Sequence, residues 1–99
     1  MKEIYSESFK RDFKKLKREH KKLFIELQSI FVVELEEYLL EKKFVSNKFR
    51  FKEMRHSNNV WSMTWSFSRP AGRATFQLAE IENELTVIWL RIGNHDVYK

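Results

Sequence analysis

The stretch GRATFQLAEIENELTVIWLRI, residues 72–92, carries the clearest pattern in the chain. Side-chain character alternates along both halves of this stretch, with the period of two that is typical of β-strands. Between the halves, Glu82-Asn83 predicts a tight hairpin. In the second half, Trp89 and Arg91 are expected on one face and Leu90 on the other. This half is apolar on nearly both faces, which predicts a strand inside a sheet.

The same alternation continues upstream of the hairpin. Residues 48–52 set three basic side chains against two phenylalanines, and residues 61–67 set large apolar side chains against serine and threonine. Pro70-Ala71-Gly72 then predicts a turn. Three or four antiparallel strands are therefore expected in the C-terminal half.

The first half of the chain has helical spacing instead. Residues 3–7 predict a short first strand, and the hydroxyl of Ser8 is expected to cap the helix that follows. The apolar stripe of this helix consists of Phe9, Phe13, Leu16 and His20. A break is expected near Glu19–Lys22, before a second helix that ends near Lys42-Lys43.

Together these elements predict a single α+β domain, residues 1–99: one short strand, two helices, then a three- to four-stranded antiparallel sheet. The helices are expected on one sheet face, leaving the other face polar and basic. The sequence has no cysteine, and its two glycines are too few for a glycine-rich phosphate loop. Without a signal peptide or a membrane-length apolar run, a soluble cytoplasmic protein is expected.

The net charge of +5 is unevenly distributed. Residues 1–22 carry nine basic and four acidic side chains, and residues 44–73 carry six basic and one acidic. Residues 23–43 and 74–99 are net acidic. Such basic blocks favour nucleic acid or an acidic protein as the partner. The alternative for the first block is a solvated helix face.

Three side chains form a set suited to cutting RNA. Arg73 opens a strand after a glycine turn, where its guanidinium could bind a phosphate through two hydrogen bonds. His95 follows the last strand and could carry a proton near neutral pH, and Tyr98 could stack on a base. RNA supplies its own nucleophile, the 2′-OH, so neither metal nor cofactor is needed. The alternative is an ordinary surface arginine and an exposed terminal histidine, which leaves a basic α+β nucleic-acid binder.

The segments Gly72–Phe76 and Val87–Tyr98, with the opening Tyr5–Leu16, resemble toxins of the RelE/ParE superfamily. The RelE-like branch implies the toxin of a toxin–antitoxin pair. Such toxins enter the ribosomal A site and cleave mRNA through the 2′-OH, without metal, and an acidic antitoxin neutralises them. By resemblance, Arg73 matches the phosphate-binding arginine and His95 the C-terminal catalytic position, which makes His95 the best candidate for the general base. Tyr98 matches the nearby aromatic residue.

The resemblance departs from RelE at one strand, where RelE has lysines and this chain has Ser62, Thr64 and Ser66. The residues expected to bind RNA instead are Lys52, Arg55, Arg69 and Arg91. The expected partners are the antitoxin, the ribosome and mRNA, with no membrane, and the toxin is monomeric or part of a toxin–antitoxin hetero-oligomer. Two alternatives stay open: a ParE-like inhibitor of DNA gyrase, and an inactive relative that only binds RNA.

Overall fold

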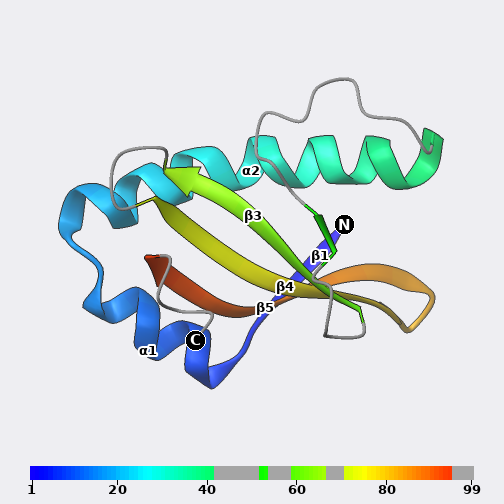
Figure 1. Cartoon of the computed structure of the whole chain (residues 1–99). Coiled ribbons are helices and arrows are strands. Elements are labelled where there is room, and N and C mark those ends of the chain that lie inside the picture. The colour runs from blue at the N-terminus through cyan, green and yellow to red at the C-terminus, as the bar shows by residue number, and fades with distance from the viewer. Residues whose placement is uncertain (42–51, 54–58, 67–70, 95–99) are drawn as a thin grey trace.

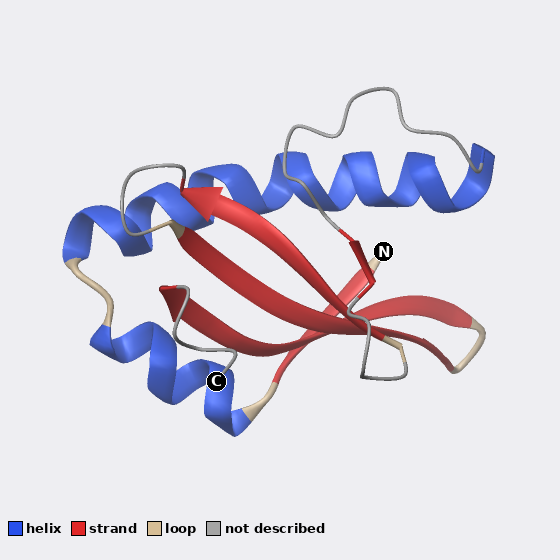
Figure 2. Ribbon diagram, in the orientation of Figure 1, coloured by secondary structure: helices blue, strands red, loops and turns tan. Residues whose placement is uncertain are grey.

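The computed structural model describes residues 1–41, 52–53, 59–66 and 71–94. The elements follow in the order β1 (Lys2–Tyr5), α1 (Glu7–Lys15), α2 (Arg18–Glu41), β2 (Lys52–Glu53), β3 (Val60–Ser66), β4 (Gly72–Ile81) and β5 (Glu84–Asn94). The strands form one sheet in the order β1-β5-β4-β3-β2, and α2 runs along one side of it (Figures 1 and 2).

The predicted α+β architecture is confirmed, with one addition. Strands β2 to β5 pair antiparallel, as expected, but β1 pairs with β5 in parallel, so that the whole sheet is mixed. The β4–β5 hairpin turns at Glu82 and Asn83, whose φ angles of 52° and 64° are both positive. A two-residue turn with both φ angles positive matches the right-handed twist of the two strands that it joins. The expected hairpin turn is therefore confirmed.

A β-bulge in β5 changes which side chains face the helices. Thr75 pairs with Arg91 and Phe76 with Trp89, which leaves Leu90 as the extra residue. The expectation that Trp89 and Arg91 share a face is therefore wrong. The bulge instead brings Ile92 to the face of Trp89, and both are buried.

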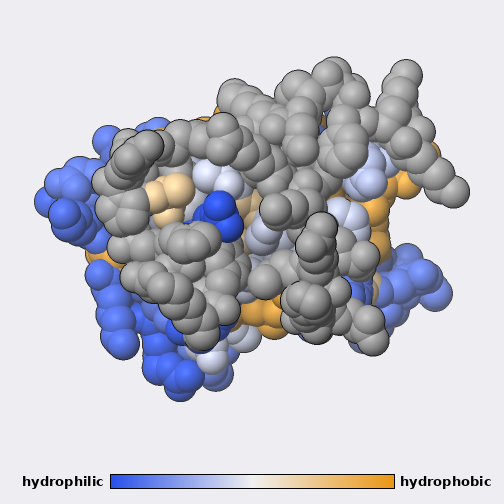
Figure 3. Space-filling view, viewed as in Figure 1, coloured by the Kyte–Doolittle hydropathy of each residue, from blue (hydrophilic) through white to orange (hydrophobic). Residues whose placement is uncertain are grey.

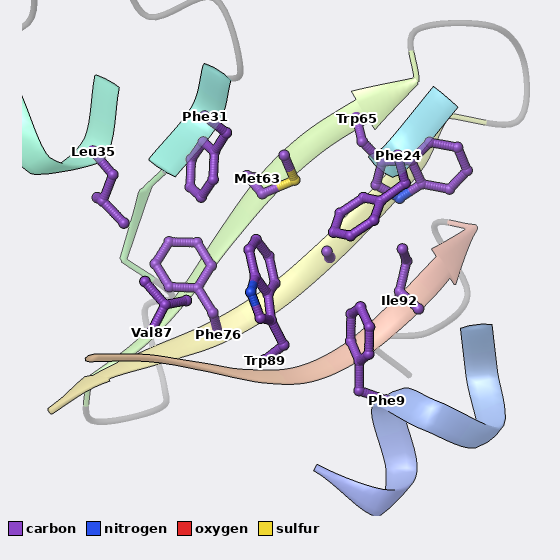
Figure 4. Close-up of a cluster of buried hydrophobic side chains, with 11 residues drawn as sticks. Phe9, Phe24, Phe31, Leu35, Met63, Trp65, Phe76, Val87, Trp89 and Ile92 are labelled. Carbon is purple, nitrogen blue, oxygen red and sulfur yellow. The ribbon is translucent and has the colours of Figure 1, made fainter. Parts of the chain in front are cut away.

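The core lies between this sheet face and the two helices (Figure 4). Trp89 is fully buried at its centre, with ring centroids 5.4–5.9 Å from four other aromatic rings. These rings belong to Phe9 of α1, Phe24 and Phe31 of α2, and Phe76 of β4. The indole Nε1 donates a hydrogen bond to Glu3 Oε1 of β1 (2.9 Å). One side chain thus joins β1, β4, β5 and both helices.

The first helix begins at a different serine from the one expected. Ser6, not Ser8, is the N-cap, and its Oγ accepts from the Phe9 N–H (3.0 Å). Ser6 Oγ also donates to the carbonyl of Leu90 (2.9 Å), at the bulge. This contact joins residues 84 positions apart in the sequence, so no local pattern distinguishes the two serines.

The helices also separate earlier than expected. Leu16 is the C-cap of α1, with extended backbone angles, and α2 begins at Arg18. The predicted break near Glu19–Lys22 is thus a few residues too late. The described part of α2 ends at Glu41, next to the expected Lys42-Lys43, which lies outside the described residues.

The two serines provide a matched test of this cap. Ser6→Ala removes an N-cap bond and a hydrogen bond to β5, so its free energy of unfolding should fall by about 1–2 kcal/mol. Ser8→Ala removes only an exposed contact with Arg11 and should cost less than about 0.5 kcal/mol. Urea unfolding followed by circular dichroism measures both. Equal losses would contradict the assignment of Ser6 as the cap.

Candidate nucleic-acid interface

Arg73 lies near the start of β4, on the sheet face that points away from the helices. Its neighbours Gly72 and Ala74 are buried on the helix side, and side chains alternate along a strand. The indole of Trp65 packs directly on Gly72: a Cβ added there would lie 2.6 Å from two ring carbons. Glycine therefore lets Trp65 cover the start of β4, and this packing fixes the strand that carries Arg73.

The described residues next to Arg73 on its own face of the sheet have short side chains or none. Its register partners are Thr64 on β3 and Gly93 on β5. Thr75, two residues along β4, lies opposite Ser62. These described neighbours are themselves buried, and none of them is acidic. A guanidinium has the geometry to bind a planar anion through two hydrogen bonds.

Arg91, another expected RNA-binding residue, is held by α1. Its Nε lies 2.5 Å from Asp12 Oδ2 and its second guanidinium nitrogen 3.1 Å from Asp12 Oδ1. Asp12 Oδ2 also accepts from the Ile92 N–H (3.2 Å). The hydrogen bonds to Asp12 raise the pKa of Arg91 above its ordinary value. Arg91 thus attaches α1 to the part of β5 that follows its pairing with β1. Contact of Arg91 with RNA stays a prediction.

A hollow of about 170 Å³ lies beside this contact. Its lining residues are Asp12 and Lys15 of α1, the C-cap Leu16, and Ile92 and Gly93 of β5. Lys15 lines this hollow. Three further exposed basic residues lie within three positions of Lys15 in the sequence: Lys14, Lys17 and Arg18. Figure 3 shows hydrophilic residues gathered over α1 and around the α1–α2 corner. The sequence placed Lys15 in a basic block but gave no signal that it lies near Gly93, the register partner of Arg73.

The other predicted site residues cannot be placed beside Arg73. His95, Tyr98, Arg55 and Arg69 lie outside the described residues, and of Lys52 only the backbone is described, opposite Ser62. The description of β5 ends at Asn94, whose register partner is Gly72. The chain therefore leaves the described part next to the start of β4, one residue before His95.

Two further findings concern the described residues only. They contain no group of three or more potential metal ligands. Neither helix in this part of the chain is long and apolar enough to cross a membrane.

No protein-family model matches the sequence, and no curated protein sequence matches it either. Solved structures do match. The E. coli toxin RelE, as a free double arginine-to-alanine mutant, aligns with a TM-score of 0.56 at 16% identity, covering 98% of this chain and 88% of that chain. The RelE–RelB complex of E. coli gives 0.52 at 16% identity, covering 94% of both chains.

A YoeB/ParE toxin from Agrobacterium tumefaciens also aligns, with a TM-score of 0.52 at 10% identity over 96% of this chain and 99% of that chain. The chain therefore has the fold of these toxins, and the fold that the sequence resemblance implies is confirmed.

The contact between Gly72 and Trp65 yields a test of how Arg73 is positioned. Gly72→Ala should lower the free energy of unfolding by about 1–3 kcal/mol, because the new methyl overlaps the indole. Ala71→Gly, at the preceding residue, is a control for local chain entropy and should cost less than about 1 kcal/mol. Thermal unfolding measures both. A Gly72→Ala variant as stable as the parent would contradict the packing of Trp65 on Gly72.

Proposed function

We propose that this protein is the toxin of a toxin–antitoxin pair and cleaves mRNA in the ribosomal A site, without metal, by attack of the 2′-OH. The observation that carries the proposal is the place of Arg73, among short side chains on the helix-free face of a RelE-like sheet. This is where the sequence resemblance puts the phosphate-binding arginine.

The proposed chemistry needs little from the protein. Attack of the 2′-OH on the neighbouring phosphorus gives a phosphorane with added negative charge, and the guanidinium of Arg73 stabilises that charge. His95 accepts the proton of the 2′-OH or protonates the leaving oxygen. Tyr98 orients the RNA by stacking. The products are a 2′,3′-cyclic phosphate and a 5′-hydroxyl, and no metal or cofactor takes part.

The positive charge of the chain supports binding to RNA. Lys52, Arg55, Arg69 and Arg91 are proposed to contact the backbone of mRNA or of ribosomal RNA, and the α1–α2 corner adds further basic side chains. Binding through phosphates releases counterions, so the association weakens as salt rises. Arg91 contributes to RNA binding through the guanidinium N–H groups that do not bind Asp12.

An acidic antitoxin is the proposed protein partner. An apolar hollow of about 330 Å³ between α1 and α2 suits it, lined by Tyr5, Phe9, Lys10, Phe13, Phe24, Ile25 and Gln28. Burial raises the pKa of Tyr5, which accepts a hydrogen bond from Gln28 (2.5 Å). The exposed Lys10 at this hollow, on a basic helix, favours an acidic segment that folds as it binds.

A gyrase inhibitor is the second candidate, because one of the similar structures is a YoeB/ParE toxin. The two candidates differ in what the protein acts on. An endoribonuclease arrests translation and needs Arg73 to cleave the phosphodiester. A gyrase inhibitor cleaves no RNA and does not need Arg73 for that step.

Substitution of the proposed catalytic residues tests the chemistry. Arg73→Ala should slow cleavage by about 10²–10³-fold and His95→Ala by about 10²–10⁴-fold, and both should abolish growth arrest. Tyr98→Ala should have a smaller effect. Arg11→Ala, which removes an exposed arginine from α1, is the matched control and should stay active.

The assay is cleavage of mRNA on programmed ribosomes, with mapping of 2′,3′-cyclic phosphate ends. Folded Arg73→Ala and His95→Ala proteins that cut as fast as the parent would overturn the catalytic assignment. A parent that cuts no RNA but inhibits gyrase would establish the second candidate.

A matched pair of substitutions tests the antitoxin surface. Ile25 and Val33 lie on α2 and are equally exposed (58%), but only Ile25 lines the hollow. Ile25→Asp should weaken binding of the acidic protein encoded beside this gene by more than about tenfold, a loss of about 1.4 kcal/mol. Val33→Asp should leave the affinity within about twofold. Calorimetry with the purified pair measures both, and equal affinities would place the partner elsewhere.

A further inference from the structure

We propose that His20 of α2 is a positioning residue for Arg73 and acts on it through Trp65 and Gly72. The inference rests on the proposed function in one respect, namely that Arg73 stabilises the phosphate that is cleaved. His20 was expected on the apolar stripe of the first helix, but the structure places it in the first turn of α2. From there its ring contacts Trp65, near the end of β3.

Trp65 is the extra residue of a β-bulge in β3. Thr64 pairs with Arg73 and Ser66 with Gly72, which leaves Trp65 between two successive pairs. A bulge can re-aim a side chain, and here the indole lies against Gly72, where a Cβ would be 2.6 Å from two ring carbons. The place of the indole and the place of the backbone that carries Arg73 therefore depend on each other.

Packing, and not a hydrogen bond, holds this indole. Trp65 is buried, and within the described part of the chain its Nε1 has no hydrogen-bond partner. Two rings of α2 meet it edge-on: His20, with ring centroids 5.4 Å apart at 67°, and Phe24, at 6.3 Å and 84°. Figure 4 shows Trp65 beside Phe24. The orientation of the Trp65 ring therefore depends on these two neighbours and on Gly72.

Of the two rings, that of His20 can be removed without opening the centre of the core. Phe24 is buried and also packs against Phe9 and Trp89, whereas His20 is half-buried. Loss of the His20 ring loosens the indole on Gly72 and lets the start of β4 shift. A displacement of about 1 Å in a group that acts on the transition state can cost about 10²-fold in rate. A small shift of Arg73 is therefore enough to slow cleavage.

The chain offers a matched control at the other end of α2. Tyr38 is also half-buried on α2 and packs edge-on against a tryptophan of β3, Trp61, with ring centroids 6.5 Å apart at 68°. Trp61 pairs with Phe76, three residues along β4 from Arg73. Removing the ring of either residue loosens α2 on β3, but of the two only His20 packs on the indole that covers Gly72.

The first measurement is cleavage of mRNA on programmed ribosomes by the full-length parent, His20→Leu, His20→Phe and Tyr38→Leu, each checked for folding by circular dichroism. His20→Leu should lower kcat at least about tenfold and leave KM within about threefold, because the guanidinium of Arg73 acts mainly on the transition state. His20→Phe keeps a ring against the indole, and its kcat should stay within about threefold of the parent, as should that of Tyr38→Leu.

NMR of the ¹⁵N-labelled proteins gives a readout that needs no cleavage. The indole Nε1–H of Trp65 and the Nε–H of Arg73 should shift in His20→Leu and stay in place in Tyr38→Leu. Equal losses of kcat in these two variants, a loss that His20→Phe does not restore, or unmoved Arg73 signals in His20→Leu would overturn the proposal. If the signals shift as predicted but the parent cuts no RNA, the positioning of Arg73 by His20 stands and the proposed cleavage fails.

Discussion

The structure depends on the burial of Trp89 between the sheet and both helices. Four aromatic rings surround its indole, and its Nε1 donates to Glu3 of β1. Aromatic pairs at these distances add about 0.5–1.5 kcal/mol each beyond the apolar area that they bury. Because the same side chain contacts both helices and the neighbouring strands, it fixes where α1 and α2 lie relative to β5.

The consequences of this packing reach the candidate site along β5. The bulge at Leu90 follows Trp89 directly, and Ser6 binds its carbonyl. Asp12 of α1 then accepts hydrogen bonds from the Ile92 N–H and from the guanidinium of Arg91. Helix α1 therefore covers the edge of β5 where β1 no longer pairs with it. One residue further, Gly93 is buried and is the register partner of Arg73. The core thus positions the end of β5 beside the start of β4, where Arg73 lies.

The sequence was sufficient for the α+β architecture and its element order, but not for the parallel pairing of β1 with β5 or for the details that build the site. Alternation and helical spacing are local, so they predicted the hairpin, the order of helices and strands, and the polar sheet face that carries Arg73. A search for a period of two cannot detect the bulge at Leu90. The bulge places Arg91 on the sheet face opposite to that of Trp89. Choosing Ser6 over Ser8 as the cap, and pairing Asp12 with Arg91, depends on contacts between residues about 80 positions apart. Lys15 became distinct from its neighbours only once α1 was placed beside Gly93.

The central claim is that an RNA phosphate binds at Arg73, on the helix-free face of the sheet. NMR titration of the ¹⁵N-labelled protein with 2′-O-methylated RNA tests it most directly, by following the Nε–H of Arg73 and the backbone amide of Gly93. The account predicts that both signals shift together and saturate with one dissociation constant, which rises with salt. Shifts confined to Tyr5, Phe13 and Ile25, with Arg73 and Gly93 unmoved, would contradict it.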